Sequence, residues 1–294
     1  MKKKIIFEGV GTALITPFNC GEIDYPALGK IIDEQIEAGI ECLVVGGTTG
    51  EAATLKDNER YELFSFAKER IGGRTKLVLG VGTNDTEKAA AHVKYSKKLG
   101  ADGLLAVTPY YNKGTKEGLI RHFEKLASLS DIPIILYNVP SRTGVNLEMD
   151  MLWRLAKNEL IVGIKEASND ADRLVSLSAF GDELWLYAGN DSQIYTVLSL
   201  GGLGVISVLS NPYPQRTREI CKQFFANNKA KSLQLQQRAI PVLNSLFIET
   251  NPAPVKHLMM LKGKCKEDLR LPLYNVSTNS AEVIKKCAEE YENN

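Results

Sequence analysis

The sequence predicts an α/β fold, a closed (β/α)8 TIM barrel with a C-terminal helical extension. Two observations predict it. Short, β-rich apolar runs alternate with longer amphipathic stretches, as expected for parallel strands buried on both faces and the helices between them. Eight such runs occur, and the chain of 294 residues exceeds the roughly 250 residues of a typical barrel. A doubly wound open sheet also alternates strands and helices, but the number and spacing of the runs favour the barrel.

The predicted strands are these eight runs, which polar residues hardly interrupt. In chain order they span residues 11–15, 42–45, 77–81, 103–107, 132–137, 160–165, 184–188 and 203–208. No dinucleotide-binding fingerprint accompanies them, because the segment Gly80-Val81-Gly82 lacks the third glycine of that motif. We therefore do not expect a nicotinamide or flavin site.

The predicted helices lie between the runs, where apolar residues recur at three- and four-residue steps. The clearest of them span residues 25–38, 58–71, 86–99 and 116–129. Gly39, Gly72 and Gly100 stand where a glycine commonly ends a helix, and Asp57 is expected to cap the start of the second helix.

After residue 208 the sequence contains no further strand-like run. Helical patterns occupy residues 215–249, 252–262 and 281–291, and the first of them includes the eighth barrel helix. We therefore divide the chain into a barrel domain, residues 1–228, and a C-terminal helical extension, residues 229–294.

The composition excludes several classes of partner. The chain has 36 Lys+Arg and 35 Asp+Glu, so its net charge of +1 gives no long-range attraction to nucleic acid or to a membrane surface. Its basic start lacks the apolar core of a signal peptide, and no stretch approaches the ~20 apolar residues of a membrane helix. The five cysteines form no C-x-x-C pair and the three histidines no H-x-x-x-H pair. We expect a cytoplasmic protein with reduced thiols and no metal site.

The candidate chemistry lies where the strands end, because barrel enzymes build their active sites at the C-terminal ends of the strands. Lys165 ends the run 160–165, so its amine is expected at the barrel mouth. Burial there disfavours the charged form, and a neutral amine can attack a ketone to form a Schiff base. The alternative is a structural ion pair with Glu166 or Glu51.

Other polar side chains follow neighbouring runs, and each has two interpretations. Tyr137 can shuttle protons beside Lys165, or it is a core aromatic with a bonded hydroxyl. Thr48 and Thr49 follow two glycines and can hold a carboxylate, or they form a turn that caps the next helix. Arg142 presents a planar guanidinium that suits a carboxylate, or it forms a surface ion pair.

Three ordered motifs carry a resemblance to a known family: Gly46-Gly47-Thr48-Thr49-Gly50-Glu51, Tyr137-Asn138-Val139-Pro140-Ser141-Arg142-Thr143-Gly144 and Gly163-Ile164-Lys165-Glu166-Ala167-Ser168. They resemble the signatures of the dihydrodipicolinate synthase / N-acetylneuraminate lyase superfamily, whose members are class I pyruvate aldolases. The resemblance covers nearly the whole chain and includes Thr108-Pro109-Tyr110-Tyr111-Asn112, Gly189-Asn190-Asp191 and Gly204-Val205-Ile206-Ser207-Val208.

The resemblance implies a catalytic group. Lys165 would form the imine with pyruvate, and Tyr137, Thr49 and Tyr111 would form a proton relay. Tyr111 would reach across a subunit interface into the neighbouring site. The enzyme would be a lyase of lysine and diaminopimelate biosynthesis that needs no external cofactor, because the imine itself is the electron sink.

The resemblance also implies a binding group and an assembly. Thr48 and Thr49 would bind the carboxylate of pyruvate, Arg142 would bind that of aspartate semialdehyde, and backbone groups at Gly189 and Ile206 would shape the pocket. Members of the family usually form homotetramers built as dimers of tight dimers.

Two other functions are alternatives to this one. A sugar-acid pyruvate lyase of the same superfamily would share the mechanism, but its members generally lack an arginine at the position of Arg142. A barrel that has lost catalysis would lack the lysine or the tyrosine at the strand ends, and both are present.

The chain departs from lysine-inhibited members of the family at the positions that bind the inhibitor. Those positions correspond here to Asp57, Arg60 and Lys88, whereas Asn84 and Tyr110 are kept. Arg60 and Lys88 would repel the ammonium groups of lysine, so we expect weak or absent feedback inhibition by lysine.

Overall fold

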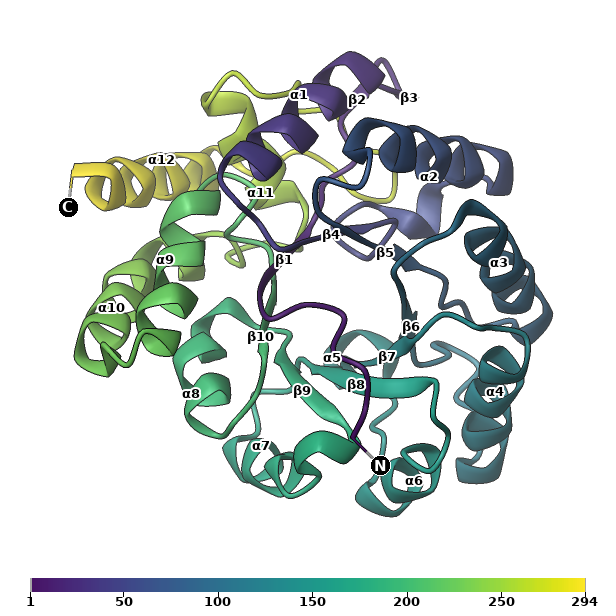
Figure 1. The fold of residues 1–294 in the computed structure, drawn as a ribbon. Helices are drawn as coiled ribbons and strands as arrows, with labels where there is room; N and C mark the ends of the chain where they lie inside the picture. The colour runs from purple at the N-terminus through teal and green to yellow at the C-terminus, as the bar shows by residue number, and fades with distance from the viewer. Residues whose placement is uncertain (1, 294) are drawn as a thin grey trace.

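Eight parallel strands close into a barrel in the computed structural model, which describes residues 2–293. The strands are β1 (Gly9–Ala13), β4 (Cys42–Val45), β5 (Lys76–Gly80), β6 (Gly103–Val107), β7 (Ile134–Asn138), β8 (Ile161–Glu166), β9 (Trp185–Ala188) and β10 (Gly204–Ser207). Their order around the barrel follows the chain, and β1 closes the barrel by pairing with both β4 and β10. The predicted fold class is confirmed, and Figure 1 shows the ring of helices around the strands.

The helices of the barrel follow the strands in alternation. They are α1 (Tyr25–Glu37), α2 (Asp57–Ile71), α3 (Thr86–Leu99), α4 (Lys116–Ser128), the one-turn α5 (Pro140–Thr143), α6 (Met149–Leu155), α7 (Ala171–Ser178), α8 (Ile194–Ser199) and α9 (Pro214–Phe225). The first four match the predicted helices to within one residue at each end. Gly72 and Gly100 end α2 and α3 with φ of 54° and 72°, a left-handed conformation that glycine adopts without strain.

Three details of the sequence interpretation need correction. Asp57 does not cap α2 but is its first residue, because Lys56 holds the cap position and its N–H donates to the carboxylate of Glu59. The predicted helical stretch 215–249 is two helices, which Asn227 separates with a left-handed φ of 64°. A small hairpin of β2 (Phe18–Asn19) and β3 (Glu22–Ile23) was not predicted, since two-residue strands leave no pattern.

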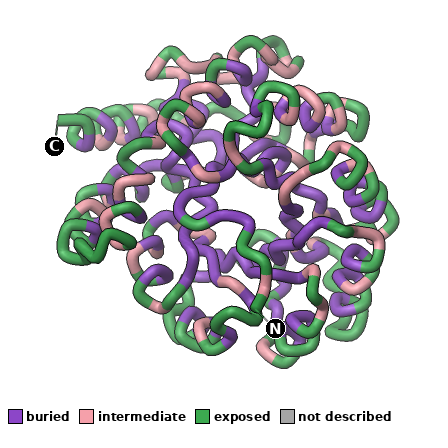
Figure 2. Tube along the Cα trace, in the orientation of Figure 1, coloured by how far each residue is buried: buried purple, intermediate pink, exposed green. Residues whose placement is uncertain are grey.

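Each barrel strand sends alternate side chains to opposite faces, and both faces are buried. One core lies between the strands and the helices and includes Leu43, Leu104 and Leu136. A second, smaller core fills the inside of the barrel and includes Val44, Leu105 and, at the upper ends of the strands, Tyr137 and Ile206. Figure 2 shows the result, with buried strands at the centre and exposed residues on the outer faces of the helices.

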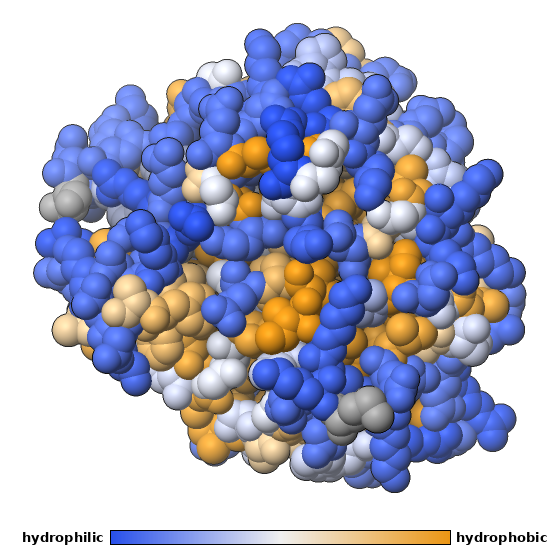
Figure 3. Space-filling view, viewed as in Figure 1, coloured by the Kyte–Doolittle hydropathy of each residue, from blue (hydrophilic) through white to orange (hydrophobic). Residues whose placement is uncertain are grey.

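The N-terminal segment covers the end of the barrel at which the strands begin. Trp185 at the start of β9 donates its indole N–H to the carbonyl of Lys3, and the hydroxyl of Tyr187 donates to the carbonyl of Phe7. Figure 1 views the barrel from this end, where the segment crosses the opening. On this face hydrophilic side chains cover the outer helices, and apolar ones gather toward the centre (Figure 3). Ligands must therefore enter from the opposite end.

The C-terminal part adds three helices, α10 (Lys229–Ser245), α11 (Ala253–Leu261) and α12 (Thr278–Asn293). Helix α10 packs against α9 and α12, and α11 packs against α12. Figure 1 shows α12 projecting beside the barrel. Since α10 begins at Lys229, the proposed boundary at residue 228 coincides with the gap between α9 and α10. No helix within residues 2–293 is long and apolar enough to cross a bilayer.

Candidate active site

A cavity of about 330 Å³ opens at the end of the barrel where the strands finish. Its walls come from the turn after β4, the ends of β5, β6 and β7, and the short helix α5. The C-terminal part contributes Asn251, Pro252, Pro272 and Leu273. Of the residues expected in the site, Thr48, Tyr137 and Arg142 line this cavity.

Lys165 and Tyr137 lie side by side on neighbouring strands. Lys165 of β8 is in register with Tyr137 of β7, so the two side chains point to the same face, the inside of the barrel. The Nζ of Lys165 lies 4.3 Å from the centre of the Tyr137 ring, and the two residues are only 5% and 6% exposed. Lys165 thus lies just below the cavity wall that Tyr137 forms.

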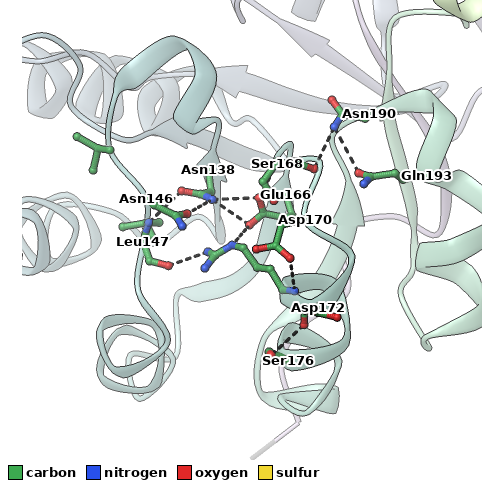
Figure 4. A network of polar contacts seen from close by, with 12 residues as sticks. Asn138, Asn146, Leu147, Glu166, Ser168, Asp170, Asp172, Ser176, Asn190 and Gln193 are labelled. Atoms are coloured by element: carbon green, nitrogen blue, oxygen red, sulfur yellow. Dashed lines mark hydrogen bonds and ion pairs between the residues drawn. The ribbon is translucent and has the colours of Figure 1, made fainter.

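The two carboxylates predicted as alternative ion-pair partners of Lys165 bind other groups. Glu166 points to the outer face of β8, where it accepts from the guanidinium of Arg173 at 2.8 Å and from the amide of Asn138 at 3.0 Å (Figure 4). Glu51 pairs with Lys256 at 2.6 Å. Among residues 2–293 no carboxylate lies within 4 Å of Lys165, so its amine is not neutralised by an ion pair.

The network around Glu166 also orders the end of β8. The backbone N–H of Ser168 donates to Glu166 at 2.8 Å, and Asn138 additionally contacts Asn146 at 2.8 Å. Arg173 on α7 bonds both Glu166 and the carbonyl of Leu147. Because Asn138, Glu166 and Arg173 are buried, their hydrogen bonds fix the strand end that carries Lys165.

The segment Thr48–Glu51 forms a tight turn after β4. The N–H groups of Gly50 and Glu51 donate to the carbonyls of Gly47 and Thr48 at 3.1 Å and 3.0 Å. The hydroxyl of Thr16 donates to the carbonyl of Gly50 at 2.7 Å. The turn has two differently placed threonines: Thr48 lines the cavity, whereas the buried Thr49 accepts a hydrogen bond from the side-chain amide of Asn251 at 3.0 Å.

Arg142 lies on α5, directly above the end of β7. Its side chain is exposed, lines the cavity and forms no surface ion pair among residues 2–293. One guanidinium N–H donates to the backbone carbonyl of Asn251 at 2.9 Å. The remaining N–H groups of the planar guanidinium stay available for a carboxylate in the cavity.

Gly189 and Ile206 belong to the barrel wall and not to the lining of the cavity. The N–H of Gly189 donates to the carbonyl of Glu166 at 2.7 Å, and a Cβ at this position would come within 2.6 Å of Ala167. Ile206 is fully buried inside the barrel. Both positions therefore close the strand ends next to Lys165.

Within one chain, Tyr111 lies outside the cavity and away from the other predicted site residues. Its side chain is 89% exposed, and its φ of 70° lies in the left-handed region that a tyrosine rarely adopts. A large aromatic side chain held outward in this way is available to a second subunit.

Two residues of the site were assigned no role from the sequence, although Asp191 stands in the motif Gly189-Asn190-Asp191. The carboxylate of Asp191 is buried, and it accepts from Ser207 and from the N–H groups of Val208 and Leu209. Its burial raises the pKa of Asp191, which these donors and the nearby Lys165 oppose. Asn251 is the second, because it contacts both the turn and Arg142. The only sequence signal for Asn251 was its place before a proline, which is a weak one.

The positions that bear on lysine inhibition gather on one side of the same cavity. Arg60, Lys88 and Tyr110 line it, and Lys88 pairs with Asp57 at 3.2 Å. The guanidinium of the buried Arg60 donates to the carbonyls of Gly80 and Ala52. Within residues 2–293 no group of His, Cys, Asp or Glu side chains is arranged to hold a metal ion, and the five cysteines are unpaired.

Known proteins resemble this chain over almost its whole length. A sequence model of the "Dihydrodipicolinate synthetase family" matches residues 6–291. The 4-hydroxy-tetrahydrodipicolinate synthase of Clostridium novyi (strain NT) is 43% identical over 287 residues, which are 97% of this chain and 97% of the relative. The crystal structure of dihydrodipicolinate synthase from Thermotoga maritima is 41% identical, has a TM-score of 0.95, and covers 98% of this chain and 99% of its own. The 4-hydroxy-tetrahydrodipicolinate synthase of Methylacidiphilum fumariolicum SolV has a TM-score of 0.95 at 38% identity, with 98% and 96% covered.

Proposed function

The chain belongs to the dihydrodipicolinate synthetase family, and we propose that it is a lyase that condenses pyruvate with L-aspartate 4-semialdehyde through a Schiff base on Lys165. The product, 4-hydroxy-tetrahydrodipicolinate, is the one that its relatives are named for. The observation that carries the proposal is the buried amine of Lys165 beside Tyr137, which forms no ion pair within residues 2–293. The activity would serve lysine and diaminopimelate biosynthesis.

The reaction runs through the amine of Lys165. The amine attacks the ketone carbon of pyruvate, and loss of water gives the imine. Loss of a proton from the methyl carbon converts the imine to an enamine, whose carbon attacks the aldehyde of the semialdehyde. The amino group of the semialdehyde part then attacks the imine carbon, which closes the ring and releases Lys165.

The proton transfers of this sequence are assigned to Tyr137, Thr49 and Tyr111. Tyr137 is supported by the contact of its ring with the amine of Lys165 and by its place in the cavity wall. Thr49 is supported by its place in the turn behind the cavity. Tyr111 would act from the neighbouring subunit, which its exposure permits.

The two substrate carboxylates are assigned to opposite sides of the cavity. Thr48 and Thr49 would hold the carboxylate of pyruvate, and Arg142 would hold that of aspartate semialdehyde. Gly189 and Ile206 would complete the wall behind the imine. The imine accepts the electrons of the reaction, so the mechanism requires no external cofactor.

The assembly and the location form part of the same proposal. A Tyr111 relay requires at least a tight dimer, and we propose a homotetramer built from two such dimers. A cytoplasmic location is supported by the five unpaired cysteines. The sugar-acid lyase alternative is not favoured, because the relatives named above are synthases and Arg142 lines the cavity.

The experiment that tests the proposal traps the imine. The protein is reduced with borohydride in the presence of pyruvate and digested, and the modified peptide is identified by mass spectrometry, with Lys165→Arg as the control. We expect the adduct on Lys165 only, together with turnover of aspartate semialdehyde and not of N-acetylmannosamine. An adduct on Lys256, or none on the native protein, would remove the mechanism; turnover of the sugar aldehyde alone would remove the substrate assignment.

A further inference from the structure

One short segment of the C-terminal part touches both sides of the candidate site. This segment, residues 251–256, consists of the last two residues of the connection after α10 and the first four residues of α11. At its start, the amide of Asn251 donates to the hydroxyl oxygen of Thr49 at 3.0 Å, and the carbonyl of Asn251 accepts from Arg142 at 2.9 Å. A single buried residue thus bridges the turn assigned to one carboxylate and the guanidinium assigned to the other.

The other end of the segment holds the same turn from a second point. The ammonium of Lys256 donates to the carboxylate of Glu51 at 2.6 Å and to the carbonyl of Asp268 at 2.6 Å. Both side chains are fully buried, and the other carboxylate oxygen of Glu51 accepts from the N–H of Arg270 at 3.1 Å. Glu51 itself has a φ of 54°, a left-handed conformation that needs support from its surroundings.

A buried ion pair of this kind is better suited to fixing geometry than to adding stability. Removing two charges from water costs about as much as their attraction returns, so such pairs contribute little net stability. They do fix the position at which two segments of the chain meet, because leaving either charge unpaired inside the protein is strongly unfavourable. The ion pair therefore fixes the position of the turn relative to α11.

We propose that Asn251 and Lys256 are positioning residues, which together fix the Thr48–Glu51 turn and Arg142 at the separation that the two substrate carboxylates require. The proposal rests on the proposed function. It assigns the helical extension a part in substrate binding, although the barrel alone carries the reacting amine.

The bond from Asn251 has a further consequence for Thr49. A hydroxyl has one proton to donate, and the oxygen of Thr49 already accepts from Asn251. The proton of Thr49 is therefore left to donate to an acceptor other than the Asn251 amide. Within residues 2–293 this is the only hydrogen bond of the Asn251 side chain, whose Oδ1 has no partner.

The first variant to test is Asn251→Ala, with Asn244→Ala, an exposed asparagine of α10, as the matched control. The measurements are KM for pyruvate, kcat, the rate of imine trapping and the melting temperature. We expect KM for pyruvate to rise about tenfold and trapping at low pyruvate to slow in proportion, as for loss of one oriented hydrogen bond. The control should match the native protein, and a native KM in Asn251→Ala would overturn the role of Asn251.

The second test separates positioning from plain stability. Lys256→Met alone leaves the Glu51 charge buried and unpaired, so it should lower the melting temperature, whereas Glu51→Gln with Lys256→Met removes both charges and should recover it. Lys285→Met on the exposed face of α12 is the control. We expect KM for pyruvate to stay raised about tenfold in the double variant even when its melting temperature is native. A double variant with native stability and native KM would overturn the role of Lys256.

Failure of this proposal differs from failure of the proposed function. If the native protein forms no adduct with pyruvate, the function itself falls. If the native protein forms the adduct and both variants bind pyruvate normally, the function stands and the positioning role of the segment falls.

Discussion

Two buried lysines show how the same residue type serves different purposes at the level of single residues. Lys256 is fully buried, and burial lowers its pKa. The ion pair of Lys256 with Glu51 opposes this effect. Lys165 is similarly buried but lies against the ring of Tyr137, and no carboxylate of residues 2–293 lies within 4 Å of its amine. An unpaired amine is the better nucleophile, so the environment and not the residue type selects Lys165.

Removing the hydroxyl of each threonine of the turn is expected to change a different kinetic constant. Thr49→Val should lower kcat about 10²-fold through loss of the proposed proton relay. Thr48→Val should mainly raise KM for pyruvate, about tenfold, through loss of a carboxylate contact. Steady-state kinetics of both variants check this. The reverse pattern would exchange the two roles, which is a real alternative because Thr48 is the threonine that lines the cavity.

Lysine is expected to be a weak inhibitor. Arg60 and Lys88 place positive charge on the side of the cavity predicted for an inhibitory lysine, and within residues 2–293 Lys88 forms an ion pair with Asp57 alone. Initial rates measured with up to about 10 mM lysine should fall by less than half. Half-maximal inhibition below millimolar lysine would contradict this, and norleucine, which lacks the side-chain ammonium, is the control.

At the level of elements, the site depends on how closely the turn after β4 approaches the end of β5. A Cβ on Gly80 would lie 2.2 Å from the carbonyl oxygen of Gly46. Glycine at position 80 is therefore required by a backbone contact that also places Thr48 and Thr49.

Gly80→Ala is expected to destabilise the protein by about 2–4 kcal/mol, because backbone and not a flexible side chain must move. Urea unfolding checks the expected loss. Gly47→Ala is the matched control, since a Cβ there meets nothing within 4 Å. Equal unfolding free energies for the two variants would show that the turn moves without cost.

Helix α2 is tied to the segment after α11 by Glu59 and Arg270, at 2.6 Å. The hydrogen bond from Arg270 lowers the pKa of Glu59 from 4.5 to about 2. A carboxyl with a depressed pKa in the folded state contributes its stability above pH 4.5 and loses it as the pH falls from 4.5 toward 2. In this window the stability of the native protein should fall more steeply than that of Glu59→Gln, as measured by thermal unfolding. Parallel pH profiles would contradict the contribution of this pair.

At the level of the whole molecule, the chain leaves one proposed catalytic group outside its own site. Tyr111 is 89% exposed, so the relay is incomplete in one subunit. The protein is therefore expected to be at least a dimer at working concentrations, which light scattering after size-exclusion chromatography measures.

Mixing two inactive variants tests the shared site directly. Tyr111→Phe and Lys165→Ala subunits are each expected to be nearly inactive alone. A mixed dimer contains one complete site, so random reassembly should recover up to about a quarter of the native activity. Recovery requires that Tyr111 act across the interface, and its absence in verified mixed dimers would place the tyrosine in its own subunit's site or outside catalysis.

The sequence by itself determined the barrel, because strands buried on both faces leave apolar runs and helices leave a three- to four-residue period. Six of the predicted runs differ from the strands by one or two residues at an end, and those at Cys42–Val45 and Gly103–Val107 match fully. It also placed Lys165 and Tyr137 at neighbouring strand ends, since both close an apolar run and parallel strands finish at one edge.

Only the tertiary structure decided that Glu166 does not pair with Lys165 and that the C-terminal extension contacts the site. Glu166 follows Lys165 in sequence, yet the alternation of strand side chains turns it to the opposite face, toward Arg173. Asn251 and Lys256 are about 200 residues from the turn that they contact, at separations of 202 and 205. No local pattern encodes such contacts, because hydrogen bonds and ion pairs between distant segments arise only when the whole chain is packed.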